Sequence, residues 1–394
     1  MSLSERFAQL TAVLRQYEPF WRPSPFVYPT PAWCRDHAEL ADACLRLPDT
    51  MPAELDAEPA VLQQWLQVHL PGMQVLPDLL ALPASAPAVP TLPAQWSVDI
   101  PGRKWQQIAA FAAHTPAHAG RLLDWCSGKS HLGRTLAQLR QQSLLAVERD
   151  PVLCREGYAQ ARAAGVSAEF LCADVLQAPP ALPRDAQVLA LHACGDLHRT
   201  LLRQLAVHPV RQLVLAPCCY HLWLRGDYQP LSALAQQQDL QLDRNSVQLA
   251  VQEAVTSSPR VRQQTAVLAA WRLGFDALQR ELRGVDEYLN TPSLPQSVVA
   301  EGFEAVCRRI AEHKQLTIPA GIDWPHYQQR GEARLQRAQK LQVVRHGFRR
   351  AMELWLVLDL ALYLEQLGYA VTLQQFCDRQ LTPRNMLLQA ERAR

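Results

Sequence analysis

Five short apolar runs, separated by segments with the spacing of helices, lie between residues 121 and 216. Parallel strands that are covered on both faces read as nearly continuous apolar runs, and helices connect one such strand to the next. The runs are residues 121–125, 143–148, 168–171, 187–192 and 212–216, and the helical segments are 132–140, 151–164 and 197–206. This alternation predicts a doubly wound α/β fold, in which ligands bind beyond the carboxyl ends of the strands.

The rest of the chain divides by its residue patterns into four regions around this core. Residues 1–70 have helical spacing, and residues 71–101 hold seven prolines and few charges, which predicts a proline-rich linker. The sheet core is expected over 102–221, and a helical, partly basic insertion over 222–351. Residues 352–394 are expected to add a last helix and the final strands, at 369–371 and 386–389, to the same sheet.

The composition excludes several classes of protein. A net charge of +2, from 39 Lys and Arg against 37 Asp and Glu, excludes a uniformly basic nucleic-acid coat protein and an acidic tail protein. Ten cysteines are too sparse for a disulfide scaffold, so we expect reduced thiols and a cytoplasmic location. The first residues lack the apolar run of a signal peptide, and the most apolar stretch, 352–367, is too short to cross a membrane. No membrane partner is expected.

The loop after the first predicted strand has the character of a ligand site. Asp124 stands at the strand end, small residues follow at Cys126 and Gly128, and a helix begins shortly after. Such a loop brings backbone N–H groups close to a ligand and directs the N-terminus of a helix at it. A nucleotide-like ligand fits this arrangement, although such turns also occur for packing alone.

Two more acids follow the next two predicted strands. Glu148 closes the second strand, 24 residues after Asp124, and Asp174 follows the third. A carboxylate at the first of these positions would accept the ribose hydroxyls of an adenosine ligand, and one at the second would accept from an adenine amino group. Each acid alone has the alternative role of a solvated helix cap. The ordered set favours a nucleoside site.

Two absent motifs narrow the ligand. The chain has no G-x-x-x-x-G-K-[ST] phosphate loop and no G-x-G-x-x-G dinucleotide loop. The carboxylate of Asp124 would repel a pyrophosphate but attract the cationic amino-acid end of S-adenosylmethionine. The sequence therefore predicts this cofactor, bound by the following residues: Asp124, Cys126, Gly128, Lys129, Gly133, Glu148 and Asp174.

Four segments carry a resemblance to a known family. They are Asp-Trp-Cys-Ser-Gly-Lys-Ser-His-Leu-Gly at 124–133, Leu-His-Ala-Cys-Gly-Asp at 191–196, Ala-Pro-Cys-Cys-Tyr-His at 216–221 and Leu-Thr-Pro-Arg-Asn at 381–385. They resemble the S-adenosylmethionine-dependent methyltransferases, in particular the group that includes the glutathione S-transferase C-terminal domain-containing proteins. The tRNA acceptor-stem 2′-O-methyltransferases are more distantly similar. The resemblance implies a Rossmann-like, seven-stranded methyltransferase sheet and this cofactor.

The chain departs from the family pattern at Ser130, where glycine is usual, at Thr382, where serine is common, and at Leu360, where an arginine often stands. Ser130 would cost cofactor affinity if its backbone needs a positive φ angle.

Further candidate residues follow the fourth and fifth strands, whose ends are expected to meet beside the transferred methyl group. They are His192, Asp196, Cys218, Cys219 and His221. His192 or His221 is a candidate general base, with Asp196 to orient it. A zinc site from Cys194, Cys218, Cys219 and His221 is a weaker alternative, because adjacent cysteines on a continuing strand point in opposite directions and no C-x-x-C pair exists. Buried packing is the commonest role of such cysteines.

The charge distribution bears on the methyl acceptor. Residues 305–350 hold 10 Lys and Arg against 3 Asp and Glu, whereas residues 1–100 hold 5 against 11. The basic side chains of this segment, which suit a phosphate backbone, are Arg308, Arg309, Lys314, Arg330, Arg334, Arg337, Lys340, Arg345, Arg349 and Arg350. RNA, either tRNA or rRNA, is therefore slightly preferred as the acceptor. A solvated helix face, a basic protein as acceptor, a non-catalytic cofactor-binding protein and, more distantly, an NAD-dependent oxidoreductase remain open.

Overall fold

The computed structural model describes residues 1–84, 87–238, 240–253 and 258–392. It divides the chain into two compact units that alternate along the sequence. The first unit comprises Met1–Arg15, Val75–Gln252 and Arg349–Arg394, and the second comprises Gln16–Gln74 and Glu253–Phe348. Residues 1–70 and 222–351, each expected as one region, therefore contribute to both units. Parts of the regions expected at 71–101, 222–351 and 352–394 fall on residues 85–86, 239, 254–257 and 393–394, which lie outside the described residues.

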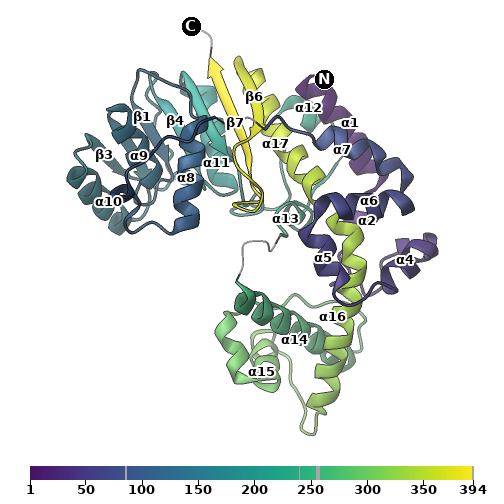
Figure 1. The fold of residues 1–394 in the computed structure, drawn as a ribbon. Coiled ribbons are helices and arrows are strands. Elements are labelled where there is room, and N and C mark those ends of the chain that lie inside the picture. The colour runs from purple at the N-terminus through teal and green to yellow at the C-terminus, as the bar shows by residue number, and fades with distance from the viewer. Residues whose placement is uncertain (85–86, 239, 254–257, 393–394) are drawn as a thin grey trace. The chain divides into compact units, whose positions relative to one another are not determined.

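The first unit is built on a seven-stranded, mostly parallel sheet, which confirms the predicted α/β fold (Figure 1). The strands are β1 (Leu122–Trp125), β2 (Leu144–Glu148), β3 (Ala168–Cys172), β4 (Gln187–Leu191), β5 (Gln212–Ala216), β6 (Tyr369–Gln375) and β7 (Met386–Arg392). Their order is β3-β2-β1-β4-β5-β7-β6. The first five strands run parallel, and β7 runs antiparallel to both β5 and β6.

The apolar runs form strands because their side chains are buried on both faces of the sheet. All residues of β1 and β5 are buried, whereas the burial of β3, which is an edge strand, is only partial. The register pairs Asp124 with Ala146 of β2 and with Leu189 of β4, so β1 lies at the centre of the parallel strands. The carboxyl ends of β1, β2, β4 and β5 consequently lie along one edge.

Helices connect and cover these strands. In the first unit they are α1 (Leu3–Gln16), α7 (Leu76–Leu80), α8 (Gly102–His114), α9 (His131–Arg140), α10 (Pro151–Ala163), α11 (Asp196–Val207), α12 (Ala233–Gln236), α13 (Arg244–Leu249) and α17 (Arg349–Gln366), with a 3-10 turn at Ala94–Ser97. Asp150 caps α10, because its carboxylate accepts from the N–H groups of Val152 and Leu153. Ile108 and Phe111 of α8 and Leu136 of α9 share a core with Leu122 and Leu189 of the sheet.

The expectation of a buried helix over 352–367 is confirmed by α17, where most residues are enclosed. Its Trp355 packs on Phe7 of α1, with ring centroids 5.1 Å apart, and donates a hydrogen bond to Thr11 at 2.9 Å. The N-terminal helix is therefore part of the sheet unit. The proline-rich segment wraps along the edge of the sheet, where the carbonyl of Pro83 accepts from the Gln375 N–H at 2.9 Å.

The second unit is helical. Its helices are α2 (Glu18–Trp21), α3 (Trp33–Asp36), α4 (Ala38–Leu45), α5 (Met51–Ala57), α6 (Pro59–His69), α14 (Pro259–Arg283), α15 (Phe303–His313) and α16 (Trp324–His346), with 3-10 turns at Pro71–Val75 and Gln296–Glu301. Phe275, Phe303 and Ile310 belong to the core of α14 and α15. A carboxylate in α14, that of Asp276, is fully buried and pairs with Arg280 and with Arg334 of α16.

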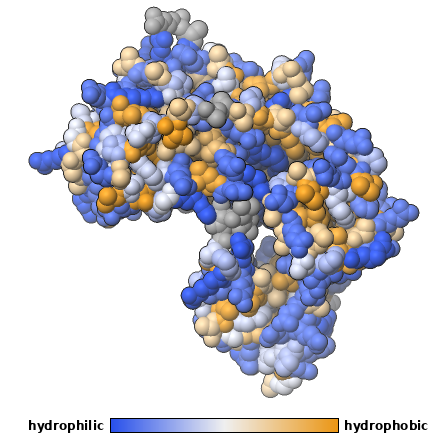
Figure 2. Space-filling model, in the orientation of Figure 1, coloured by the Kyte–Doolittle hydropathy of each residue, from blue (hydrophilic) through white to orange (hydrophobic). Residues whose placement is uncertain are grey.

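The surface is mixed in polarity. On the face shown in Figure 2, hydrophilic residues cover much of the surface, with apolar residues between them. Within the described ranges, no helix has both the length and the apolar character needed to cross a bilayer.

Candidate functional site

The sheet has a topological switch point between β1 and β4. From β1 the chain proceeds outward through β2 and β3, and then returns to β4 and β5 on the other side of β1. At such a point the loops leave the sheet in opposite directions, and a crevice opens beyond the carboxyl ends of the two strands. Asp124 and Cys126 lie at the end of β1, and His192 and Cys194 follow the end of β4. The two groups of predicted site residues therefore lie on either side of this switch point, at the carboxyl ends of β1 and β4.

Asp124 organises the loop after β1 from inside. Its buried carboxylate accepts from the Ser130 hydroxyl at 2.7 Å and from the Gly133 N–H at 3.0 Å. Burial raises the pKa of Asp124 to about 6, against the lowering effect of these two hydrogen bonds. A Cβ on Gly133 would lie 2.9 Å from the Cβ of Asp124 and 2.6 Å from the Ser130 hydroxyl, so only glycine fits there. The carboxylate of Asp124 and the absence of a side chain at Gly133 thus allow the loop after β1 to pack closely against the first turn of α9.

The backbone of this region is strained at several points. Cys126, Ser130, His192 and Cys219 all have positive φ, at 56°, 53°, 67° and 47°. Residues other than glycine rarely adopt this conformation, and they do so chiefly at functional sites. The structure thus meets the condition under which Ser130 was expected to carry a cost. Its hydroxyl, which glycine would lack, bonds to Asp124.

Glu148, at the end of β2, joins the loops around it. Its carboxylate accepts from the Gly128 N–H at 2.9 Å and from the N–H groups of Arg149 and Asp150 at 2.9 and 3.0 Å. Asp174 accepts from the Leu176 N–H at 3.0 Å. The pKa of the Cys126 thiol is raised, chiefly by burial. The negative charges of Glu148, Asp124 and Asp174 act in the same direction. Asp124, Glu148 and Asp174 stand at the ends of three neighbouring strands, and the charges of all three carboxylates contribute to the raised pKa of this thiol.

Lys129 differs from the other residues of this loop. Its ammonium pairs with Glu156 of α10 at 2.5 Å. The charge of a different lysine, Lys104 on α8, acts on the crevice, because it lowers the pKa of both Asp124 and His192.

His192 has a partner that the sequence did not indicate. Its Nε2 lies 2.8 Å from Oε1 of Gln107 on α8, and the amide nitrogen of Gln107 donates to the Leu381 carbonyl at 3.3 Å. The amide oxygen therefore accepts from His192, so Nε2 carries the proton and Nδ1 is left as the acceptor. Burial and the charge of Lys104 lower the pKa of His192, so the ring is neutral at pH 7.

Asp196 lies apart from this pair. Its carboxylate is 3.7 Å from Arg199 and 3.5 Å from Arg203, both on α11. The expectation that Asp196 orients the histidine is thus not met, because Gln107 holds His192 instead. Gln107 precedes β1 by fifteen residues and lies in no recognisable motif, so only the packing of α8 on the sheet reveals it.

Three cysteines meet beyond the ends of β4 and β5. The sulfur atoms of Cys194, Cys218 and Cys219 lie within 4.8 Å of one another, and those of Cys194 and Cys218 are 3.5 Å apart. Hydrogen bonds from Cys194 and Cys218 lower the pKa of Cys219, and the charges of Arg384 and His221 act in the same direction. The argument from a continuing strand does not apply, because β5 ends at Ala216 and Cys219 adopts a left-handed backbone.

A polar network fixes the loop after β5. Tyr220 donates to Glu353 of α17 at 3.2 Å, and Glu353 accepts from Arg350 at 2.7 Å. Arg350 also donates to the side-chain oxygen of Asn385 at 2.8 Å. The Cys-Cys-Tyr-His segment and the Thr-Pro-Arg-Asn segment are thus joined through one arginine, although 165 residues separate Tyr220 from Asn385.

The same loop extends toward β2. The guanidinium carbon of Arg149 lies 5.4 Å from the ring centroid of Trp223, and the Asp196 N–H donates to the Leu222 carbonyl at 3.0 Å. The loop after β5 consequently contacts both the segment after β2 and the loop after β4.

Comparison with known proteins agrees with this geometry. Residues 103–225 match the model of a protein family described as a methyltransferase domain. The match supports a methyltransferase. The comparison with curated proteins found no match. A solved structure, of a protein in the NADB-Rossmann superfamily from Streptococcus agalactiae, covers 54% of this chain and 96% of its own, with 16% identity and a TM-score of 0.25. At that TM-score the likeness carries no argument about function.

The matched segment contains β1 to β5 and every predicted cofactor and acceptor residue. The basic segment at 308–350 lies outside it, and its side chains are largely engaged. Arg308, Arg309 and Arg330 pair with Glu304, Glu301 and Glu281. Lys340 pairs with Asp49 at 2.8 Å, and Arg345 and Arg349 are buried.

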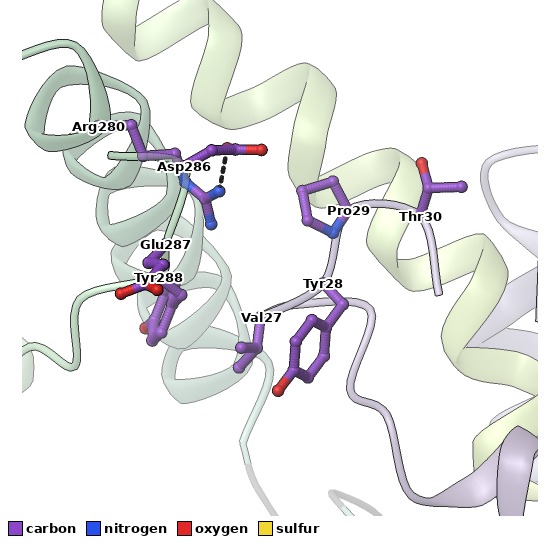
Figure 3. A pocket seen from close by; sticks show the side chains of 8 residues that line it. All are labelled: Val27, Tyr28, Pro29, Thr30, Arg280, Asp286, Glu287 and Tyr288. Atoms are coloured by element: carbon purple, nitrogen blue, oxygen red, sulfur yellow. Dashed lines mark hydrogen bonds and ion pairs between the residues drawn. The ribbon is translucent and has the colours of Figure 1, made fainter. Parts of the chain in front are cut away.

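A hollow in the second unit is a separate feature. Residues 27–30, Arg280 and residues 286–288 line it, as Figure 3 shows. The hollow has a volume of about 620 Å³. Two of its three charged side chains, Arg280 and Asp286, are joined by an ion pair, so they have little charge left to bind a ligand. It contains none of the predicted site residues.

Proposed function

We propose that the chain is a cytoplasmic methyltransferase that uses S-adenosylmethionine and belongs with the glutathione S-transferase C-terminal domain-containing group that its motifs resemble. The observation that carries this proposal is the set of three carboxylates, those of Asp124, Glu148 and Asp174, which stand at the carboxyl ends of the neighbouring strands β1, β2 and β3. The ten cysteines are all free thiols, which supports the proposed cytoplasmic location.

The crevice fits this cofactor in charge and in hydrogen-bonding capacity. When bound, S-adenosylmethionine supplies a methyl group on a sulfonium, which is already a good leaving group. Buried Asp124 has its negative charge at the end where a cationic amino acid would lie. Glu148 has one oxygen, Oε2, with a single donor, the Gly128 N–H, so it retains capacity for ribose hydroxyls. Asp174, which follows β3, would accept from the amino group of the base.

On the acceptor side the main task of the protein is to orient the acceptor and remove its proton. We propose that Nδ1 of His192 takes the proton from the methyl acceptor, because Gln107 holds the other ring nitrogen, Nε2, in its protonated form. The lowered pKa of His192 keeps the ring neutral and able to act as a base at pH 7. Asp196, Cys218, Cys219 and His221 would line the acceptor side around it.

For the acceptor we propose RNA ahead of protein, on the excess of basic residues over 305–350. The ion pairs of Arg308, Arg309 and Arg330 neutralise part of that excess, so the attraction for phosphates is smaller than the residue count implies. The acidic segment 1–100 would attract a basic protein instead.

The test follows label from methyl-labelled S-adenosylmethionine into separated RNA and protein fractions of a lysate that lacks this protein. Glu148→Ala is the cofactor-site variant, and Glu169→Ala, an exposed acid on β3, is its matched control. Label in the RNA fraction that E148A loses and E169A keeps would support the proposal in full.

Two other outcomes have distinct meanings. Label confined to the protein fraction would keep the enzyme and overturn RNA as the acceptor. No label in either fraction, with cofactor binding intact by calorimetry, would overturn a macromolecular acceptor and favour a small-molecule acceptor or a non-catalytic binding protein. NAD binding without S-adenosylmethionine binding would revive the oxidoreductase alternative.

A further inference from the structure

The distances in the cysteine cluster match those of a metal site. In tetrahedral zinc–thiolate centres the Zn–S bonds are about 2.3 Å, which places sulfurs roughly 3.8 Å apart. The sulfurs of Cys194, Cys218 and Cys219 are all within 4.8 Å of one another, and the closest pair is 3.5 Å apart. Three thiols that converge in this way form one face of a tetrahedron without a change of fold.

The fold itself produces this convergence. Leu191 and Ala216 are paired in register at the ends of β4 and β5, so Cys194 and Cys218 leave the sheet side by side. The Gly195 N–H donates to the Cys218 carbonyl at 3.0 Å, which ties the two loops together. The left-handed backbone of Cys219, with φ 47°, turns its side chain back toward the other two. A strained backbone at a non-glycine residue is a feature that functional sites retain.

A candidate fourth donor, His221, lies two residues further along the chain, outside the group of three sulfurs that lie within 4.8 Å of one another. Nδ1 of His221 is enclosed and has no hydrogen-bond partner among the described residues. A buried imidazole nitrogen without a partner is costly, and a metal ion would satisfy it. Cys218 is buried, while Cys194 and Cys219 are partly exposed, so an ion has a path to the sulfurs.

We infer that Cys194, Cys218, Cys219 and His221 bind one Zn²⁺ ion. Each thiol loses its proton to solvent as its Zn–S bond forms, and no oxidant or reductant takes part. The ion would tie the loop after β4 to the loop after β5 beside His192. This inference concerns metal binding alone, and it stands or falls independently of the methyl acceptor.

The test measures metal on the purified full-length protein. We expect about one zinc per chain by inductively coupled plasma mass spectrometry after growth with zinc, and after replacement by Co²⁺ a thiolate-to-cobalt charge-transfer band. Cys194→Ser, Cys218→Ser and Cys219→Ser should each lower zinc affinity at least tenfold in a competition with a chromogenic chelator. Cys377→Ser, a partly exposed cysteine of the same unit outside the cluster, is the matched control and should keep the metal.

The Co²⁺ spectrum of the wild-type protein needs no variant, so the inference remains testable if a cysteine variant fails to fold. His221→Ala should keep the thiolate band but change the cobalt d–d bands. Wild-type protein that holds no zinc and gives no charge-transfer band, with all ten thiols reactive, would overturn the inference. A Cys194–Cys218 disulfide, detected as two missing thiols, would overturn it as well. Methyl transfer enters none of these readouts, so failure here leaves the proposed function in place, and failure there leaves the metal site in place.

Discussion

The side-chain oxygen of Gln107 lies 2.8 Å from Nε2 of His192, which leaves Nδ1 of that ring as the proton acceptor. Gln107 acts through His192, so we class it as a positioning residue. Gln107→Leu should lower kcat for methyl transfer by roughly one to two orders of magnitude, a part of what general base catalysis contributes, with little change in KM for the cofactor.

Gln107→Glu distinguishes positioning from a general structural effect. A carboxylate beside His192 raises the pKa of that ring, so the acidic limb of the pH–rate profile should move to higher pH. Above that limb the rate should recover, whereas Q107L stays slow at every pH. Gln106→Leu and Gln106→Glu, at the exposed neighbouring position, are the controls. A profile for Q107E that coincides with the wild type would contradict this role.

Ser130 combines a strained backbone with a useful hydroxyl. Ser130→Ala removes the hydrogen bond to Asp124 and keeps the positive φ, so it should cost about 2 kcal/mol of unfolding free energy. Ser130→Gly loses the same bond but relieves the backbone, so it should be about 1 kcal/mol more stable than S130A in urea denaturation. Gln141, at φ 54° at the end of α9, is the control. There Q141G should stabilise the chain relative to Q141A without affecting the cofactor.

Asp124 should make stability depend on pH in an unusual direction. Its pKa of about 6 exceeds the ordinary value of 3.8, so the folded chain binds this proton more tightly than the unfolded chain. The contribution of Asp124 to stability therefore becomes less favourable as pH rises from about 4 to 6, by roughly 3 kcal/mol in all. The stability of wild type relative to Asp124→Asn should fall over that window, as measured by urea unfolding at several pH values. A difference that does not vary with pH would mean that Asp124 titrates normally.

In the second unit, we expect the buried carboxylate of Asp276 to contribute strongly to the stability of the fold. It accepts from Gln279 and Arg280 at 2.8 Å and pairs with Arg334. Asp276→Ala leaves the guanidinium of Arg334 without its anion and leaves Arg280 only the exposed carboxylate of Asp286, so it should cost about 3 kcal/mol or more. Asp286 also pairs with Arg280, but its side chain is 97% exposed, and Asp286→Ala should change stability little. Equal effects of the two changes would contradict the pairing.

Substitutions of Arg350 and Arg309 distinguish a structural role from RNA binding within the basic segment. Arg350→Ala removes the guanidinium beside the buried Glu353 and should cost about 3 kcal/mol of stability. Arg309→Ala should leave stability nearly unchanged. If RNA docks on this segment, R309A should weaken binding and reduce the slope of binding affinity against salt by about one ion. Unchanged RNA affinity in R309A would argue against docking there.

Much of the sheet unit could be predicted from the sequence because the signals are local. The apolar runs at 144–148 and 212–216 are almost wholly buried, and the run at 168–172 is partly buried. The strands that these three runs form begin and end within one residue of the predicted limits. Asp124, Glu148 and Asp174 follow their strands directly, so a parallel arrangement alone brings them to one edge.

The tertiary structure decided what depends on groups distant in the chain or on single backbone angles. Gln107 meets His192 across 85 residues, and Arg350 joins Tyr220, through Glu353, to Asn385. The basic segment reads as a charged face, yet ion pairs neutralise part of it, such as Arg308 with Glu304 of the same helix and Arg330 with Glu281 of α14. An apolar run predicts a buried strand, because the signal lies in consecutive residues of the sequence. It does not predict that the backbone of Cys219 turns left-handed, and that one angle brings three thiols together.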